Sequence, residues 1–569
     1  MPRLHPFVPL WFSTALLFAQ EAAVAPAAPA SPFPMGVPER IRDVGIAESQ
    51  AMRLLRDLTG KVGHRLTGSD NFTKACQWAA GEFYAMGVPV VTLEKWAEWK
   101  LVWNRGAWVG RITNPVAMEL YVATEAWSAG TNGPRVGLVV RAPTTVEAVT
   151  RKAVANKWLY YAKRPPKAVR EACEKLGVLG WLHRAGDPDE KFPLRVRVFG
   201  DHTVAMRSIE QVPTVPVVAI RADQADELGK LLDTGVDVTG QFDIQNTFRD
   251  GPLPLYNVVA EIPGSELPEE VVIVCGHLDS WHQAQGTTDN GTGATSTLEA
   301  ARILMAAGAK PKRTIRFCLW GGEEQGLLGS HAYVQRHRRE MDKVSAVFNH
   351  DTGTNWAQSL GAPANMKAQL EPVFAPLGRL LTPPEASFDG EVFKLSVVKE
   401  LAGRGGSDHA SFLAVGVPGL NWGLTGRSNY GSHTWHTQWD TIDVAIEEYQ
   451  RHTATVIAMA ALGTANLDTM LDRTGVVAGG RPQSQSYGEA MFDAELEGMK
   501  FTALKADGRA AKMGVQVGDL LVKCNGEDLE SLRDVFRVSR DTTGEELVFT
   551  LKRGDATVQA TMKKADLRR

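Results

Sequence analysis

Acidic and histidine side chains follow three apolar segments of the sequence at the point where each segment ends. The segments are VVIVC (271–275), TIRFCLW (314–320) and VSAVFNH (344–350), and the side chains are His277 and Asp279, Glu323 and Glu324, and Asp351. Asp289 lies in a loop rich in Gly, Thr and Asn after the first segment, and His436 lies in a later HTQWD sequence. Histidine and carboxylate ligands without a thiolate suit zinc or another borderline divalent metal.

The charge balance of this set predicts two metal ions. Two Zn²⁺ ions carry four positive charges, whereas Asp289, Glu324 and Asp351 together carry three negative charges. One bridging hydroxide would bring the site to neutrality, which a mostly buried cleft requires. A single Zn²⁺ ion would leave the same site with a net negative charge.

Each part of this pattern also has an ordinary structural interpretation. A histidine at the end of a strand is usually hydrogen-bonded within the protein. A Glu-Glu pair often begins a helix, and Asp289-Asn290-Gly291 is typical of a turn. Their joint occurrence at successive strand ends favours a functional site, because ligands bind beyond the carboxyl ends of parallel strands.

Strands and helices alternate in the part of the chain that carries these residues. NVVAEIPG (257–264) is a further apolar strand, and ATSTLEAARILMAAG (294–308) has the apolar spacing of a helix. This alternation predicts an α/β fold with a mostly parallel central sheet and helices on both faces. Nearer the N-terminus, Ser69 or Asp70 is placed as the N-cap of a helix that ends at Gly87.

Composition limits the class of protein. The net charge is −3, from 62 basic and 65 acidic residues, which provides no basic surface for nucleic acid. The N-terminus has the charged, apolar and small-residue order of a signal peptide, although a disordered tail is the alternative. Its apolar stretch, Phe7 to Phe18, is too short to span a membrane, and the 5 cysteines are too scattered for a disulfide framework. We therefore expect a secreted or periplasmic protein without a membrane span.

The order of motifs GHLDSW, TTDNGTG, GGEE, HDTGT, SDHASF and WHTQWDT resembles the co-catalytic di-zinc exopeptidase family of bacterial aminopeptidases and carboxypeptidase Q. GHLDSW and the Trp-Asn-Arg-Gly sequence at 103–106 are most similar to the carboxypeptidase Q-like branch. His282 and the Ser407-Asp408-His409 sequence depart from that branch. The resemblance implies a zinc-exopeptidase (phosphorylase/hydrolase-like) fold with two zinc ions per chain.

The resemblance also implies a role for each residue of the set. His277 would bind one zinc and Glu324 the other, with Asp289 as the bridge. Asp351 would complete the ligands of the first zinc and His436 those of the second zinc. His433, three residues before His436, is an alternative to it. Glu323 would be the general base, and Asp279 would orient His277, as carboxylates often do for ligating histidines.

The sequence patterns and this resemblance divide the chain into six segments. They are a signal peptide (1–25), a first catalytic segment (37–130), an inserted small α/β domain that resembles a protease-associated domain (131–245), a second catalytic segment (246–470), a linker (471–488) and a β-rich domain that resembles a PDZ domain (489–566). The PDZ-like loop would be Gly498 to Phe501, which would capture the C-terminus of a peptide. Alternatively, this domain only packs on the catalytic one.

These expectations combine into a functional hypothesis. The protein would be a secreted di-zinc metallo-exopeptidase that hydrolyses short peptides at a chain terminus, as an aminopeptidase or as a dipeptidase of the carboxypeptidase Q type. A metal-bridged hydroxide would attack the peptide bond. Arg404 is a candidate for holding a substrate carboxylate, and a homodimer is one possible assembly. The alternatives are a non-catalytic peptide-binding or receptor protein on the same fold and a single-zinc acyltransferase of the glutaminyl-cyclase type.

Overall fold

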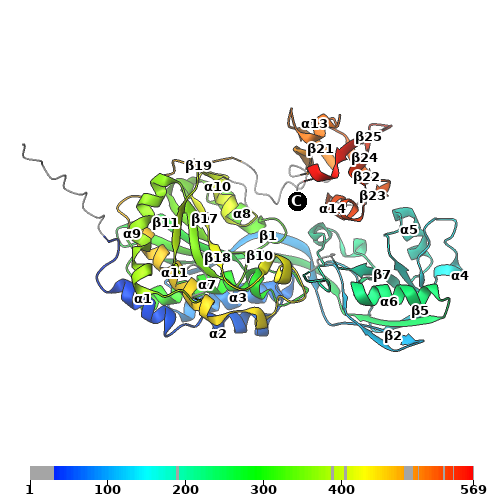
Figure 1. The fold of residues 1–569 in the computed structure, drawn as a ribbon, viewed down its shortest axis with the longest axis horizontal. Coiled ribbons are helices and arrows are strands. Elements are labelled where there is room, and N and C mark those ends of the chain that lie inside the picture. The colour runs from blue at the N-terminus through cyan, green and yellow to red at the C-terminus, as the bar shows by residue number, and fades with distance from the viewer. Residues whose placement is uncertain are drawn as a thin grey trace, which may run out of the picture.

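The computed structural model describes residues 31–186, 191–385, 390–402, 406–479, 491–497, 499–529, 532–542 and 544–567. The expected signal peptide, Arg404 and Gly498 lie outside these residues. The described chain forms a main domain (31–104 and 247–479), an inserted domain (108–244) and a C-terminal domain (491–567), each with its own sheet (Figure 1). Within the described ranges, no helix is both long and apolar enough to cross a membrane.

The main domain is built on a six-stranded sheet. Its order is β1 (Val90–Asn104), β10 (Thr247–Ile262), β12 (Arg313–Trp320), β11 (Leu267–His277), β13 (Val344–Asn349) and β17 (Gly419–Asn421). The strands from β12 to β17 run parallel, whereas β1 and β10 are antiparallel. The expected parallel arrangement thus holds for one side of the sheet. The other side is antiparallel because β1 and β10 pair along their length and together lead out to the inserted domain.

Helices cover both faces of this sheet (Figure 1). Val272 and Val274 of β11 pack into the larger core, whereas Ile273 and Cys275 of the same strand face a second core. The larger core is covered by α1 (Val37–Ile46), α2 (Ala51–Asp57), α3 (Asp70–Ala85), α7 (Thr292–Ala306), α9 (Ala364–Leu380) and α11 (Glu447–Ala465). The second is covered by α8 (Leu328–Arg336) and α10 (His409–Leu413). Ser69 is the N-cap of α3, since its side chain accepts the Phe72 N–H.

Short strands complete the main domain. β14 (Trp356–Ala362) pairs with β15 (Lys394–Val397) and with β18 (Gly423–Thr425). β16 (Leu401–Ala402) pairs with β19 (Val476–Val477). Residues 471–479, which the sequence suggested as linker, therefore belong to the main domain. Strands as short as β19 carry little periodic signal, so their partner is decided by the tertiary structure.

The inserted domain has an eight-stranded sheet. Its order is β3 (Met118–Leu120), β2 (Trp108–Asn114), β9 (Val238–Ile244), β5 (Arg135–Arg141), β6 (Trp158–Tyr161), β7 (Gly180–Ala185), β8 (Val217–Arg221) and β4 (Val122–Ala123). Its helices are α4 (Arg151–Val154), α5 (Lys167–Lys175) and α6 (Ala222–Asp233). The sheet includes three strands that precede the expected start at residue 131. β2 joins the sheet by pairing with β9 and β4 by pairing with β8, whereas β3 pairs with β2. The pairings with β8 and β9 join segments far apart in the chain, so they are not visible as local patterns.

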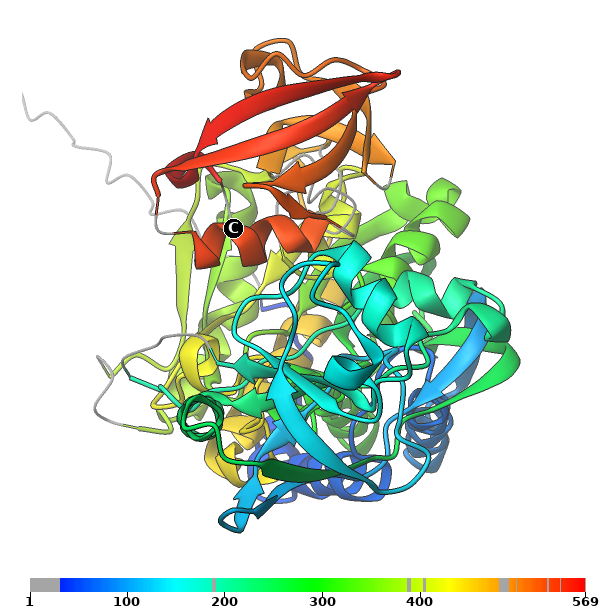
Figure 2. The ribbon, with the colours of Figure 1, turned by 90° about the vertical axis from the view of Figure 1, so that its right-hand side faces the viewer.

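The C-terminal domain is a small antiparallel sheet with two helices. Its strands are β20 (Ala494–Glu497), β21 (Lys500–Leu504), β22 (Leu520–Cys524), β23 (Glu527–Asp528), β24 (Glu546–Arg553) and β25 (Ala556–Lys563), and its helices are α13 (Arg509–Lys512) and α14 (Leu532–Asp541). It has a core of its own. It lies beside the inserted domain (Figure 2), and Lys163 is 2.8 Å from Glu527 across that boundary.

Candidate metal centre

The predicted ligands follow three neighbouring strands. β11 ends at His277, β12 ends just before GGEE (321–324), and β13 ends two residues before Asp351. These strands are adjacent in the order β12-β11-β13 and run parallel. Their carboxyl ends therefore bring histidine and carboxylate groups to one edge of the sheet, as the sequence predicted.

The ligand atoms form two groups, and within each group the atoms lie within 4.8 Å of one another. The groups are His277, Glu323 and Asp351, and Asp289, Glu324 and His436. In the first group, His277 Nε2 lies 3.6 Å from Asp351 Oδ1 and 3.9 Å from Glu323 Oε2. All three side chains are buried or nearly so. The histidine therefore faces two carboxylates in a place that is largely shielded from water.

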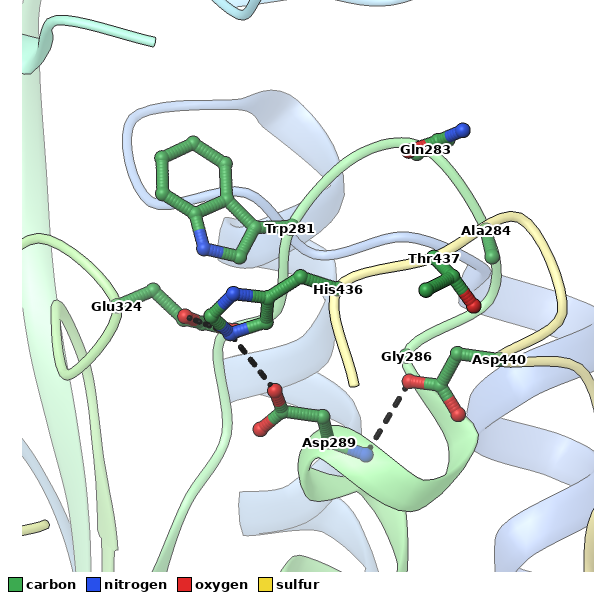
Figure 3. A pocket seen from close by; sticks show the side chains of 9 residues that line it. All are labelled: Trp281, Gln283, Ala284, Gly286, Asp289, Glu324, His436, Thr437 and Asp440. Carbon is green, nitrogen blue, oxygen red and sulfur yellow. Dashed lines mark hydrogen bonds and ion pairs between the residues drawn. The ribbon is translucent and has the colours of Figure 1, made fainter. Parts of the chain in front are cut away.

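The second group surrounds His436. Its Nε2 lies 2.9 Å from Asp289 Oδ2 and 3.0 Å from Glu324 Oε2, as Figure 3 shows. His436 has a left-handed backbone, with φ of 58°, a conformation that non-glycine residues adopt rarely. Asp289, Glu324, His436 and Trp281 line a hollow of about 210 Å³ at this group.

Asp289 connects the two groups through its two carboxylate oxygens. Oδ1 lies 3.3 Å from His277 Nε2, whereas Oδ2 is the atom that faces His436. Asp440 fixes the backbone at this point, since its carboxylate accepts the N–H groups of Thr288 at 2.6 Å and of Asp289 at 3.2 Å. One carboxylate therefore lies between two histidines, which is the arrangement expected of a ligand shared by two metals.

The buried carboxylates of this cluster need compensating positive charge: although burial lowers the pKa of His277 and of His436, the acids beside them raise both above the usual range. His277 Nε2 and Glu324 Oε1 are buried atoms without a hydrogen bond. Burial raises the pKa of Glu323 well above its usual range, and burial together with the Asp289 charge raises the pKa of Glu324 to about 7. Two cations would supply the missing charge and the missing partners, so the donor set fits two divalent metal ions.

Asp279 has a different contact from the one expected. Its backbone carbonyl lies 3.0 Å from His277 Nδ1, whereas its carboxylate oxygen lies 3.6 Å away. The carboxylate instead accepts the backbone N–H groups of Glu323 and Glu324, both at 3.2 Å, and the Thr67 hydroxyl at 3.0 Å. Asp279 therefore positions the GGEE turn with its side chain and His277 with its main chain.

Arg65, which the sequence analysis did not identify, holds the loop between His277 and Asp289. Its fully buried guanidinium donates to the carbonyl oxygens of Leu278 at 2.6 Å, Gln285 at 2.8 Å and Gly286 at 2.8 Å. Burial lowers its pKa to about 10, so the group stays charged at neutral pH. Only its place in an HRLTGSD sequence near a helix start could have drawn attention to it.

Two histidines whose roles the sequence did not assign, His433 and His282, have structural contacts. The ring of His433 stacks on Phe192 at 4.7 Å, and His433 is in neither ligand group. His282 is fully buried, and its Nε2 lies 2.8 Å from the Thr124 carbonyl oxygen. Its ring packs edge-on against Trp103 at 5.2 Å, and its contact with Thr124 ties the loop after β11 to the inserted domain.

Comparisons with known proteins agree with this geometry. Residues 257–460 match the model of Peptidase family M28, and this range contains both ligand groups. Carboxypeptidase Q of Homo sapiens is 28% identical over 442 residues, which cover 76% of this chain and 88% of that protein. Carboxypeptidase Q of Xenopus laevis is 27% identical over 446 residues, which cover 75% of this chain and 88% of that protein.

A solved structure shows the same fold. The crystal structure of a Peptidase M28 precursor from Shewanella amazonensis superposes with a TM-score of 0.53 at 25% sequence identity, covering 77% of this chain and 97% of that chain. The mixed α/β architecture is thus shared with a member of the family whose model matches here. Because that match spans both groups of ligands, the chain is a zinc metallopeptidase of the exopeptidase type with a site for two zinc ions.

Proposed function

We propose that the protein hydrolyses a peptide bond at one terminus of short peptides. The observation that carries this proposal is the position of Asp289 between His277 and His436, with one carboxylate oxygen facing each. Asp351 would complete the ligands of the first zinc, and Glu324 those of the second. Each zinc would then have three protein ligands, with Asp289 shared, which leaves room for water and substrate as catalytic sites require.

Glu323 is left over by this assignment and would act as the general base. Two bound zinc ions would supply a water of lowered pKa and would polarise the carbonyl of the scissile bond. The carboxylate of Glu323 would take the proton of that water and return it to the leaving amine. Burial raises the pKa of Glu323, which makes its carboxylate a stronger base than that of an exposed glutamate.

The different environments of Glu323 and Glu324 would give these neighbouring acids different roles. The side chain of Glu324 is 3% exposed and faces His436, whereas that of Glu323 is 10% exposed and has the longest contact in its group. Asp279 accepts the backbone N–H groups of both residues, so the main chain that carries the two carboxylates is fixed. A shift of either would move a base or a ligand, and such positions tolerate little displacement.

The proposal has two forms, an aminopeptidase and a carboxypeptidase Q-like dipeptidase. The resemblance at GHLDSW favours the second.

The other domains enter the proposal with separate roles. The inserted domain would be a protease-associated domain, and the C-terminal domain a PDZ-like module that binds the C-terminus of a peptide. The N-terminal segment would direct export, which would place the enzyme in the periplasm or outside the cell. The support for these roles is the resemblance in sequence together with the separate cores of the two domains.

Metal content and substrate preference, measured on one preparation, test the proposal. We expect about two zinc ions per chain and hydrolysis of either aminoacyl anilides or unblocked dipeptides, but not of peptides blocked at both ends. One zinc per chain with cyclisation of N-terminal glutamine would favour the single-zinc acyltransferase. Two zinc ions without turnover of any peptide would favour a binding or receptor protein.

A further inference from the structure

Asp440 lies four residues after His436 and holds the loop that carries Asp289. Its carboxylate Oδ1 accepts the Thr288 N–H at 2.6 Å and the Thr288 hydroxyl at 2.8 Å, and its Oδ2 accepts the Asp289 N–H at 3.2 Å. Figure 3 shows the contact with the Asp289 N–H next to the contact between Asp289 and His436. One loop therefore carries both a candidate zinc ligand and the anion that fixes the neighbouring carboxylate.

The main chains of these two loops are also joined around Asp440. The Asp440 carbonyl accepts the Gln285 N–H at 3.1 Å, and Gln285 Oε1 accepts the Ile442 N–H at 2.7 Å. Arg65 binds the same loop, since its guanidinium donates to the Gln285 carbonyl at 2.8 Å. The segment that leads to Asp289 is thus held by a cation at its carbonyl groups and by an anion at its N–H groups.

The surroundings of Asp440 make its carboxylate difficult to replace. Asp440 is 4% exposed and Thr288 is fully buried, so water does not reach these contacts. Three donors face the two carboxylate oxygens, whereas an amide has one acceptor oxygen. Hydrogen bonds to an ionised carboxylate are strong, and a buried donor that loses its acceptor is costly. Asp440 is in neither ligand group, although it lines the same hollow.

We propose that Asp440 is a positioning residue for both zinc ions, because it fixes the main chain from which the Asp289 carboxylate extends. The two oxygens of that carboxylate lie 3.3 Å from His277 Nε2 and 2.9 Å from His436 Nε2. A rotation of the main chain at Asp289 would therefore displace both oxygens at once. This inference rests on the proposed role of Asp289 as the shared ligand, and it assigns the support of that ligand to a residue that binds no metal itself.

Zinc affinity tests the inference without any substrate. Zinc would be withdrawn from the natural protein and from Asp440→Asn with a chelator of known affinity, which gives the dissociation constants of the two zinc ions. We expect both constants to rise about 10–100-fold in Asp440→Asn, as for other residues that support metal ligands. Asp440→Glu keeps the charge and should recover part of the affinity. Unchanged constants in Asp440→Asn, or a rise in only one of them, would overturn the inference.

Two further variants are matched controls. Asp443→Asn is the same substitution three residues later, at an exposed side chain, and should leave both constants within about twofold of the natural values. Thr288→Val removes the hydroxyl contact but keeps both N–H groups, so we expect a smaller rise than in Asp440→Asn. The thermal midpoint of each zinc-free protein shows whether it is folded. Should Asp440→Asn not fold, a rise of both constants in Asp440→Glu supports the inference and the absence of any rise overturns it.

Kinetics at saturating zinc distinguish positioning from substrate binding, because Asp440 lines the hollow. We expect kcat to fall in Asp440→Asn with little change in KM, whereas a rise in KM alone would make Asp440 a substrate contact and overturn the inference.

Asp289→Asn separates this inference from the proposed function. Both dissociation constants should rise in this variant when Asp289 is shared, and a rise in only one would refute the shared ligand itself. Two raised constants in Asp289→Asn together with unchanged constants in Asp440→Asn would keep the shared ligand and refute the role of Asp440.

Discussion

The carboxylate of Asp279 accepts the backbone N–H of Glu323 at 3.2 Å, so a residue just after β11 holds the turn that follows β12. The same carboxylate also accepts the Glu324 N–H. One side chain thus fixes both the expected base and an expected ligand. Such supporting contacts set the position of a catalytic carboxylate as firmly as the ligands themselves.

Asp279→Asn should reduce activity by disturbing the GGEE turn. The amide group has a single acceptor oxygen and places an NH₂ group against one of the N–H donors of the turn. We expect kcat/KM to fall about 10–100-fold, as for other residues that support metal ligands. Thr67→Val removes only the hydroxyl that donates to Asp279 and should have a smaller effect. Unchanged kcat/KM in Asp279→Asn would show that the turn does not depend on this contact.

Glu323→Gln should separate proton transfer from metal binding. The amide cannot take a proton, so kcat should fall about 10²–10⁴-fold while zinc content stays near two per chain. Glu324→Gln is the comparison. It replaces a proposed ligand of the zinc that His436 would bind, so we expect metal content to fall. Substantial activity in Glu323→Gln would show that Glu323 is not the base, and loss of zinc from this variant would indicate a ligand instead.

Arg65→Met should loosen the loop that joins His277 to Asp289. The substitution leaves the carbonyl groups of Leu278, Gln285 and Gly286 buried without their donor, so we expect a loss of about 3 kcal/mol or more in the free energy of unfolding. The measurement is urea unfolding followed by tryptophan fluorescence. Arg56→Met is the control, since Arg56 is 61% exposed and its contact with Glu447 is a surface ion pair. Equal small losses in both variants would contradict the role of Arg65.

Zinc uptake should release protons and tighten as the pH rises. Burial alone would lower the pKa of His436, but the charges of Glu324 and Asp289 raise it to about 9, and burial raises the pKa of Glu324 to about 7. Both groups must lose their protons to bind zinc, so apparent affinity should increase with pH from about 6 to about 9. Calorimetry in two buffers of different ionisation enthalpy measures the released protons. An affinity independent of pH over this range would contradict the assigned ligands.

Removal of the C-terminal domain should leave the peptidase intact when the cut follows residue 479. That domain has its own core, and the ion pair of Lys163 with Glu527 is exposed on the lysine side. We expect kcat/KM for dipeptides to stay within about twofold, because exposed ion pairs contribute little to stability. A cut after residue 470 would also remove β19 and the buried Leu471, and should lower the thermal midpoint. Loss of dipeptide hydrolysis in the protein cut after residue 479 would show that the C-terminal domain takes part in the active site.

The sequence by itself determined the parallel part of the sheet and the candidate ligands. Continuous apolar segments such as VVIVC occur where strands are buried on both faces, and polar groups at their ends must then meet at one edge. His277, Glu323, Glu324 and Asp351 could be predicted for this reason. Ser69 as an N-cap is likewise a local property of the chain.

The tertiary structure decided what depends on contacts between distant segments. The sequence placed Asp279 beside His277, but the three-dimensional arrangement directs its carboxylate to the turn after β12. Arg65 belongs to a segment without a ligand motif, and it reaches the site only because two loops of the main domain that are distant in sequence meet there. Hydrogen bonds and ring contacts between residues more than two hundred positions apart leave no periodic signal, so only the folded chain reveals them.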